Sequence, residues 1–211
     1  MAVTTQKLSF ADYLAYDDGS GTRYELVDGD LVAMGLGTGL HGAIAEFLTE
    51  QFKLAAQQTS QPWTAKDMRI SIRSPRSTRW DTSRIPDVVV LPIAQWEAMR
   101  AKEAVIELTD PPPLLVVEVV SASTVTNDYR AKHSEYSVLE IPEYWIVDPL
   151  EDRVTVGYLQ AGRYDDEVFV GRATIRSNLL PDLGLTAQQV LSASFRSLLM
   201  LATTLSQFFL L

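Results

Sequence analysis

Three short, almost uninterrupted apolar runs in the middle of the chain constrain its fold more than any other feature. They are IPDVVVL (85–91), LLVVEVV (114–120) and EYWIVD (143–148). Such runs are typical of strands that are covered on both faces of a sheet. Helices are expected between them, over AQWEAMRAKEAV (94–105) and TVTNDYRAKHSEYSVLE (124–140). We therefore expect an α/β fold, in which helices flank both faces of a mixed central sheet.

Two β-hairpins are expected around this central part. RYELVDGDLVAM (23–34) carries the turn-forming pair Asp28-Gly29 between two strand-like segments. RVTVGYLQAGRYDDEVFV (153–170) carries Ala161-Gly162 in the same position. The fold should thus have an N-terminal and a C-terminal hairpin.

Three further segments show clear local patterns. GLHGAIAEFLTEQFKLAAQQ (39–58) has the period of an amphipathic helix. DMRISIR (67–73) alternates strictly and predicts one half-buried strand. Ser9 and Asp12 have the spacing of a capping box, so a short helix is expected to begin there.

The 211 residues contain no internal repeat or linker, so we expect one domain over residues 1–191. The apolar stretch 192–211 should form a helical extension that packs on the body or on a second subunit. The stretch falls short of the about 20 apolar residues that a membrane span needs. The alternative to packing on protein is therefore a helix that lies on a membrane surface. The N-terminus lacks an apolar signal segment. We expect a cytoplasmic protein without a membrane span.

Residue composition excludes several kinds of site. The chain has no cysteine and two histidines. Disulfides, thiolate zinc sites and cysteine nucleophiles are therefore impossible, as is a multi-histidine metal site within one chain. Neither a G-x-S-x-G elbow nor a phosphate-binding P-loop is present, so these hydrolase and nucleotide-binding classes gain no support.

Charge is distributed unevenly along the chain. The net charge of −9 argues against a protein that coats nucleic acid. Residues 66–84 nevertheless hold six basic residues against two acidic ones. This segment is either a solvated hairpin face or a phosphate-binding surface. In the second case the candidate nucleic-acid contacts are Arg69, Arg73, Arg76 and Arg79.

The word Gly37-Thr-Gly39-Leu-His-Gly42 matches the dinucleotide fingerprint G-x-G-x-x-G. The strand before it belongs to a hairpin, and no acidic residue follows at the expected distance. We therefore interpret the word as a helix start, which His41 caps or packs against.

Glu118 interrupts the second apolar run. An ionised carboxylate inside such a strand costs several kcal/mol unless a partner or a metal compensates it. Asp87 lies in the first run, and the two carboxylates would converge if their strands are neighbours. Either a divalent cation binds between them, or Glu118 pairs with a buried lysine or arginine.

Pro86-Asp87 followed by Glu118-Val119-Val120 resembles the PD-(D/E)XK nuclease superfamily. Flanking sequence motifs resemble those of the Uma-two family, whose members are described as restriction endonucleases. The motifs are YELVDGDL (24–31), RIPDVVVL (84–91), VVEVVSAST (116–124), the triplet Asp128, Lys132 and Tyr136, and IPEYWIVDP (141–149). The likeness covers roughly residues 8–191.

This resemblance implies a metal-dependent endonuclease that cleaves DNA, with Mg²⁺ or Mn²⁺ held by Asp87 and Glu118. The superfamily motif has a lysine two residues after the glutamate, where this chain has Val120. The resemblance assigns that role to Lys132 on the following helix. The alternative for Lys132 is an exposed pair with Asp128, four residues earlier.

Glu25 is the fourth candidate catalytic residue. It is either an outer metal ligand or the partner of Arg23 or another basic residue. The carbonyl of Val119 is a possible further ligand, and Glu46 is a weaker candidate. A homodimer is expected, because a duplex presents two strands and the apolar tail needs a partner.

Two other functions are kept open. Val120 and the acidic body favour a catalytically inactive nuclease fold that serves as a binding or regulatory module. A glycosidase with Asp87 and Glu118 as acid and base would require an aromatic-lined sugar cleft.

Overall fold

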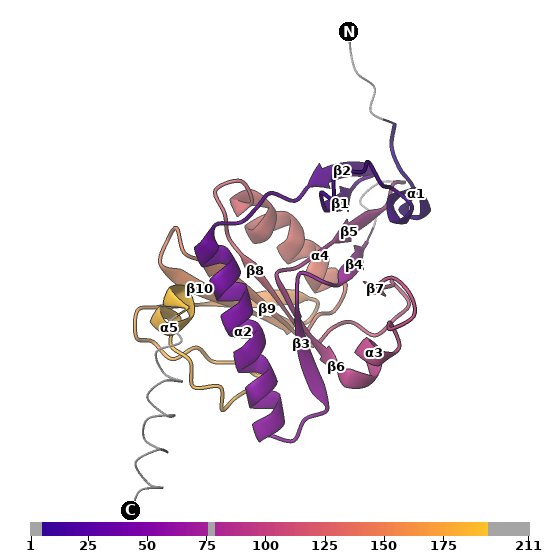
Figure 1. Cartoon of the computed structure of the whole chain (residues 1–211). Coiled ribbons are helices and arrows are strands. Elements are labelled where there is room, and N and C mark those ends of the chain that lie inside the picture. The colour runs from indigo at the N-terminus through magenta and orange to yellow at the C-terminus, as the bar shows by residue number, and fades with distance from the viewer. Residues whose placement is uncertain (1–5, 76–78, 194–211) are drawn as a thin grey trace, which may run out of the picture.

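The computed structural model describes residues 6–75 and 79–193 of the chain (Figure 1). Within these residues the strands form two mixed sheets. The six-stranded sheet has the order β11 (Arg163–Val170), β10 (Arg153–Gln160), β9 (Glu143–Asp148), β8 (Leu115–Val119), β6 (Val88–Pro92), β3 (Trp63–Asp67). The five-stranded sheet has the order β2 (Asp30–Ala33), β1 (Tyr24–Val27), β5 (Thr82–Arg84), β4 (Ser71–Ser74), β7 (Val105–Ile106).

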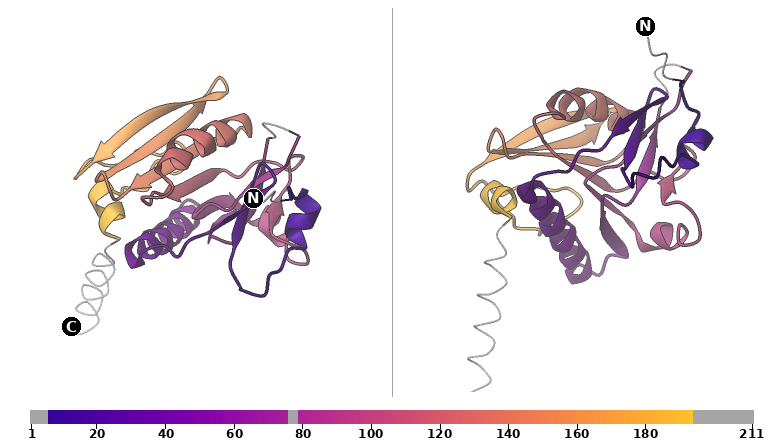
Figure 2. Two further views of the ribbon diagram at one scale, coloured as in Figure 1. Left: turned by 90° about the horizontal axis from the view of Figure 1, so that it is seen from above. Right: turned by 45° about the horizontal axis from the view of Figure 1, so that its top comes forward.

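Helices cover both faces of the six-stranded sheet (Figures 1 and 2). On one face lie α2 (Gly39–Gln58) and α5 (Ala187–Ser192), and on the other lies α4 (His133–Val138), which continues a π-helical segment, Asn127–Lys132. Short helices α1 (Phe10–Leu14) and α3 (Ile93–Glu97) lie at the second sheet and at the end of β6. The predicted α/β class with a helix-flanked mixed sheet is confirmed.

The three apolar runs are neighbouring strands, as predicted. β8 is parallel to β9 and antiparallel to β6. Alternate residues of β6 enter different cores: Val88 and Val90 pack with α2, whereas Val89 packs with the cluster that contains Tyr136 of α4. Because every residue of β8 and β9 is buried, their sequences show no alternation.

Both hairpins form with two-residue turns. Asp28 and Gly29 have φ of 50° and 79°, and Ala161 and Gly162 have φ of 47° and 78°. Positive φ at both central positions matches the twist of paired strands, which explains the glycines. The N-terminal hairpin does not extend the central sheet, however. It belongs to the second sheet, where β1 pairs with β5.

The prediction of one strand over 67–73 was wrong. β3 ends at Asp67, the chain bends at Met68 with φ of 42°, and β4 begins at Ser71 in the other sheet. The bend is held by the Met68 N–H, which donates to the carbonyl of Asp87 at 3.0 Å. Ser71 is buried like Ile72, since β4 is covered on both sides. Periodicity alone does not reveal a change of sheet.

The predicted helix over 94–105 is also shorter than expected, because α3 ends at Glu97 and β7 begins at Val105. The capping box is confirmed: the Ser9 hydroxyl accepts from the Asp12 N–H, and the Asp12 carboxylate accepts from the Ser9 N–H. Most of the predicted extension over 192–211 lies outside the described residues. No helix within the described ranges has the length and apolar character to cross a bilayer.

Candidate active site

Asp87 and Glu118 meet because of the register between β6 and β8. Val88 pairs with Val117 in the antiparallel ladder, so the residues next to them, Asp87 and Glu118, lie opposite each other. Both valines face α2, so Glu118 faces the side of α4, while Asp87 lies just before β6. Asp87 is fixed there, since its Oδ2 accepts from the Val119 N–H at 2.6 Å.

Lys132 brings an ammonium to the same point from the π-helical segment. Its Nζ lies 2.8 Å from Glu118 Oε2, 3.2 Å from Asp128 Oδ1 and 3.7 Å from Glu25 Oε1. Burial lowers the pKa of Lys132, but the carboxylates of Glu118, Glu25 and Asp128 outweigh burial and raise it. Lys132 is thus a buried ammonium among three carboxylates, and the pair with Asp128 that the sequence offered is formed but buried, not exposed.

Glu118 is satisfied on both of its oxygens. The Tyr136 hydroxyl donates to Oε1 at 2.7 Å, and the Lys132 ammonium donates to Oε2 at 2.8 Å. Burial raises the pKa of the Glu118 carboxyl well above its usual range, Asp87 reinforces the rise, and Lys132 opposes it. From the sequence, the partner of the buried glutamate was either a metal ion or a buried basic residue. In the structure Glu118 has a lysine partner.

Glu25 forms a salt bridge with a buried arginine. Arg84 Nη1 donates to Glu25 Oε2 at 3.2 Å, and the Ile85 N–H donates to Oε1 at 3.0 Å. Arg84 also donates to both carboxylate oxygens of Glu135, at 2.8 and 2.7 Å. Arg23 is not the partner of Glu25, because its guanidinium donates to the Met68 carbonyl at 2.6 Å.

His41 belongs to this site although its sequence context predicted only a role in the helix start. That role exists, since the Thr38 hydroxyl at the N-cap of α2 accepts from the His41 N–H. The imidazole, however, reaches Asp87, with Nε2 2.8 Å from Oδ1. This hydrogen bond raises the pKa of His41. A Cβ at Gly37 would lie 3.0 Å from the ring, so the glycine leaves room for it.

Asp128 is the second residue that the candidate set missed. It is 1% exposed, its Oδ1 lies 3.2 Å from the Lys132 ammonium, and its Oδ2 accepts no hydrogen bond within the described part of the chain. Burial raises the pKa of its carboxyl, and Lys132 opposes the rise. The sequence feature that could have identified Asp128 as a site residue was its position four residues before Lys132, on the same helical face.

These side chains line a cavity of about 490 Å³ between the end of β8 and the loop before α2. Glu25, Asp87, Glu118 and Asp128 face it around a single ammonium. No three His, Asp or Glu side chains in the described ranges already have the arrangement of a metal site. The donor chemistry nevertheless fits a hard divalent cation, because the carboxylates that line the cavity outnumber its one lysine, and Asp128 Oδ2 accepts no hydrogen bond from the described residues.

Comparison with known families agrees with this geometry. The Uma2 family model, described as "Putative restriction endonuclease", matches residues 10–188. The chain belongs to the Uma2 family. The crystal structure of "a putative nuclease belonging to DUF820" from Anabaena variabilis ATCC 29413 has a similar fold, with a TM-score of 0.66. The identity is 17%, and the match covers 88% of this chain and 98% of that one. No curated protein matches significantly.

The predicted family and its nuclease-like fold are thereby confirmed. The position where the superfamily motif has lysine is occupied by Val120, which is buried in the same apolar cluster as Tyr136 and Tyr144. Lys132 places its ammonium on Glu118 from the helix instead. In this Uma2 chain the lysine and the glutamate thus meet through packing rather than along one strand.

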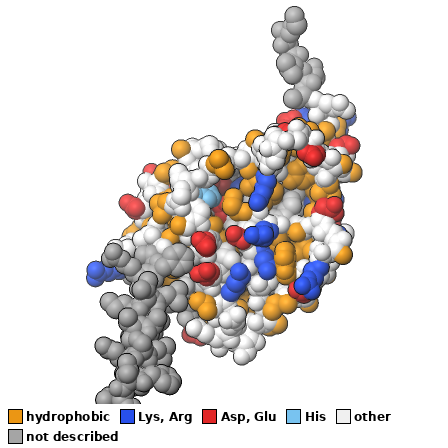
Figure 3. Space-filling view, in the orientation of Figure 1, with side chains coloured by type: hydrophobic (Ala, Val, Ile, Leu, Met, Phe, Trp, Pro, Cys, Tyr) orange, Lys and Arg blue, Asp and Glu red, His pale blue; other side chains and the backbone are white. Residues whose placement is uncertain are grey.

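The basic segment 66–84 does not form one surface. Arg84 is buried, and Arg73 pairs with Asp81 at 2.8 Å and Glu107 at 2.9 Å. Arg69 and Arg79 are exposed, while Arg76 lies outside the described residues. On the face seen in Figure 3, basic side chains lie among acidic ones rather than in a continuous patch.

Proposed function

We propose that this chain is a divalent-metal-dependent endonuclease that hydrolyses DNA phosphodiester bonds. One observation carries the proposal. Asp87, Glu118 and Lys132 come from the start of one strand, the middle of another and a helix, yet they converge at one cavity in a chain of the Uma2 family.

Asp87 and Glu118 would hold Mg²⁺ or Mn²⁺, which prefer oxygen ligands. A bound ion of this kind activates water and neutralises phosphate charge. The excess of carboxylates over cations at the cavity supports this assignment. Glu25 is held by Arg84, so we assign it an outer, electrostatic role rather than direct coordination.

Lys132 would stabilise the negative charge that develops on the phosphate, since its ammonium lines the cavity and its raised pKa keeps it charged. His41 is a positioning residue in this proposal. It holds Asp87 Oδ1 while the Val119 N–H holds Oδ2, so the carboxylate keeps one orientation. Arg69 and Arg79 remain the candidates for contacts with the nucleic-acid backbone.

A second function has an observation in its favour. Both oxygens of Glu118 are bonded to Lys132 and Tyr136, so this carboxylate needs no ion to be stable. A binding or regulatory module without turnover is compatible with that arrangement. The glycosidase alternative gains no support, because no Trp, Tyr or Phe of the described residues lines this cavity.

The test is cleavage of a supercoiled plasmid in the presence of Mn²⁺ or Mg²⁺. A metal concentration of about 5 to 10 mM is used, so that a weakly binding site for a hard cation is filled. We expect nicked and linear products that disappear with excess chelator and with Asp87→Asn. Asp182→Asn is the matched control, because it removes the same charge from an exposed loop far along the chain.

Two outcomes would overturn the proposal. Cleavage that persists in Asp87→Asn would remove the metal site from the mechanism. Absence of both cleavage and calorimetric Mn²⁺ binding would favour the regulatory module. The homodimer stays a prediction, which sedimentation equilibrium tests.

A further inference from the structure

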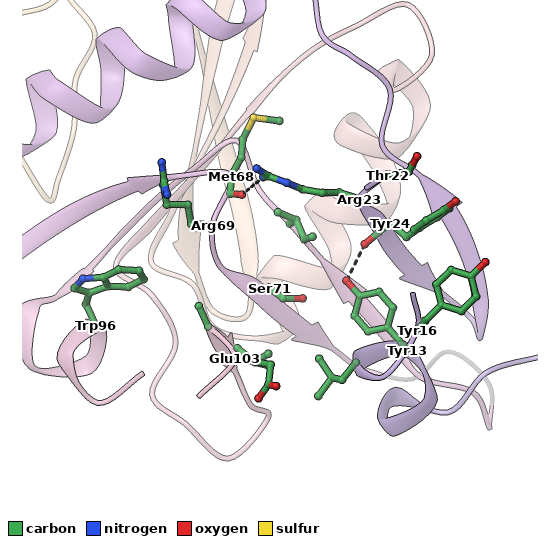
Figure 4. A pocket seen from close by; sticks show the side chains of 14 residues that line it. Tyr13, Tyr16, Thr22, Arg23, Tyr24, Met68, Arg69, Ser71, Trp96 and Glu103 are labelled. Carbon is green, nitrogen blue, oxygen red and sulfur yellow. Dashed lines mark hydrogen bonds between the residues drawn. The ribbon is translucent and has the colours of Figure 1, made fainter. Parts of the chain in front are cut away.

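A second cavity of about 550 Å³ lies beside the first, between α1, β1 and α3 (Figure 4). Met68 and Ile85 line both cavities and form their common wall. Arg23 crosses near this wall, where its guanidinium donates to the Met68 carbonyl at 2.6 Å. A chain molecule that passes this wall would therefore contact both cavities.

Aromatic rings lie on two sides of the second cavity. Tyr13, Tyr16 and Tyr24 gather on one side and Trp96 lies on the other (Figure 4). Their apolar faces offer stacking surfaces to a flat heterocycle.

Two of the tyrosines are fixed before any ligand binds. The Tyr13 hydroxyl donates to the Tyr24 carbonyl at 2.7 Å, and the Tyr24 hydroxyl donates to Asp18 at 2.6 Å. Tyr16 packs edge-on against Tyr24, with ring centroids 5.6 Å apart, and is itself 44% exposed. The cavity thus presents an ordered aromatic wall with an accessible ring.

Positive charge borders the side of this cavity nearest the first one. Arg23 and Arg69 line it, and both are exposed. Lys66 adds its ammonium 4.4 Å from the centre of the Trp96 ring. Glu103, an acidic lining residue, lies at the opposite end of the cavity (Figure 4). Phosphates would be attracted to the arginine side, which leaves the aromatic interior for bases.

We propose that this second cavity binds an unpaired nucleotide of the strand that enters the first cavity, so that the preferred substrate carries a single-stranded segment. The inference rests on the proposed nuclease function and names its substrate class. Stacked bases of a duplex have no free faces, whereas an unpaired base can be inserted between aromatic side chains.

The test measures binding without cleavage. Fluorescein-labelled oligothymidylate of eight residues is titrated with the full chain in excess chelator, and anisotropy gives Kd. We expect Tyr16→Ala and Trp96→Ala to weaken binding about fivefold or more, because each removes a stacking surface. Tyr16→Phe and Trp96→Phe keep an aromatic ring and should stay within about twofold of wild type. Circular dichroism verifies that each variant is folded.

Two further ligands distinguish the contribution of the bases to binding from that of the phosphates. An octamer of abasic sites should bind weakly and equally to wild type and Tyr16→Ala. A blunt duplex should bind more weakly than oligothymidylate. An oligouridylate that loses affinity equally in Tyr16→Ala would support the stacking role and extend the substrate to RNA.

The proposal is overturned if both alanine variants bind oligothymidylate as tightly as wild type, whatever the plasmid assay shows. Failure of the nuclease function gives a different result. In that case no metal-dependent cleavage is found, yet oligothymidylate binding still depends on Tyr16 and Trp96.

Discussion

The ammonium of Lys132 lies 2.8 Å from the carboxylate of Glu118, and the two groups are buried together. Glu118 comes from a central strand and Lys132 from the π-helical segment that precedes α4. π-Helical turns are rare and occur often at functional sites. Both groups line the candidate active-site cavity.

Removal of the lysine should destabilise the fold. Lys132→Met leaves the carboxylates of Glu118 and Asp128 buried without their cation, and breaking a buried ion pair in this way costs about 3–5 kcal/mol. Urea denaturation at pH 7, followed by circular dichroism, measures the loss. The double variant Lys132→Met/Glu118→Gln should recover part of it, because it removes the Glu118 charge but leaves Asp128 without its cation. Equal stability of wild type and Lys132→Met would contradict the burial of this pair.

The hydroxyl of Tyr136 should contribute more to stability than that of Tyr144. Tyr136 donates to the Glu118 carboxylate at 2.7 Å, whereas Tyr144 donates to the Asp128 carbonyl at 2.9 Å. Hydrogen bonds to charged groups contribute about 1.5–3 kcal/mol and neutral ones about 0.5–1.5 kcal/mol. We expect Tyr136→Phe to lose more free energy of unfolding than Tyr144→Phe. Similar losses for the two variants would indicate that Glu118 is protonated in the folded state, because both hydrogen bonds would then be neutral.

Glu143 should make stability depend on pH. Burial raises the pKa of its carboxyl, while hydrogen bonds from Trp145, Ser177 and the backbone of residues 178 and 179 oppose the rise. A raised folded pKa favours the folded state below the unfolded pKa, and this contribution is lost as pH rises through the folded pKa. Glu143→Gln cannot titrate, so wild type should gain stability relative to it as pH falls from 7 to about 4.3, the pKa of an unperturbed glutamate. Urea denaturation at several pH values measures this difference, which would be constant with pH if Glu143 did not titrate.

His41 should matter for metal affinity through Asp87. Its imidazole holds Asp87 Oδ1 at 2.8 Å, and loss of such an outer partner costs about 10- to 100-fold in metal affinity. We expect His41→Ala to raise the Kd for Mn²⁺ by that factor in calorimetry. The other histidine, His133, contacts Asp166 at 3.0 Å, so His133→Ala is the control and should bind Mn²⁺ like wild type. An unchanged Kd in His41→Ala would remove His41 from the site.

Local pattern predicted most secondary structure correctly. The apolar runs became β6, β8 and β9, and the helix expected over 39–58 is α2 with those bounds. Both hairpin turns were recognisable from the residues at their centres. The bend at Met68 was not, because an alternating sequence looks the same whether its residues belong to one sheet or two. Arg73 likewise looked available for phosphate, although tertiary contacts pair it with two carboxylates.

By itself the sequence determined which segments are strands, that Glu118 lies inside a buried one with Asp87 at the start of another, and which family the chain resembles. Periodicity and the cost of burying charge are properties of the chain alone, so they are visible without coordinates. Only the tertiary structure decided which charges meet. His41 reaches Asp87 across 46 residues, and Arg84 reaches Glu25 across 59. Contacts of that separation depend on strand order and helix placement, which the packing of the whole core selects.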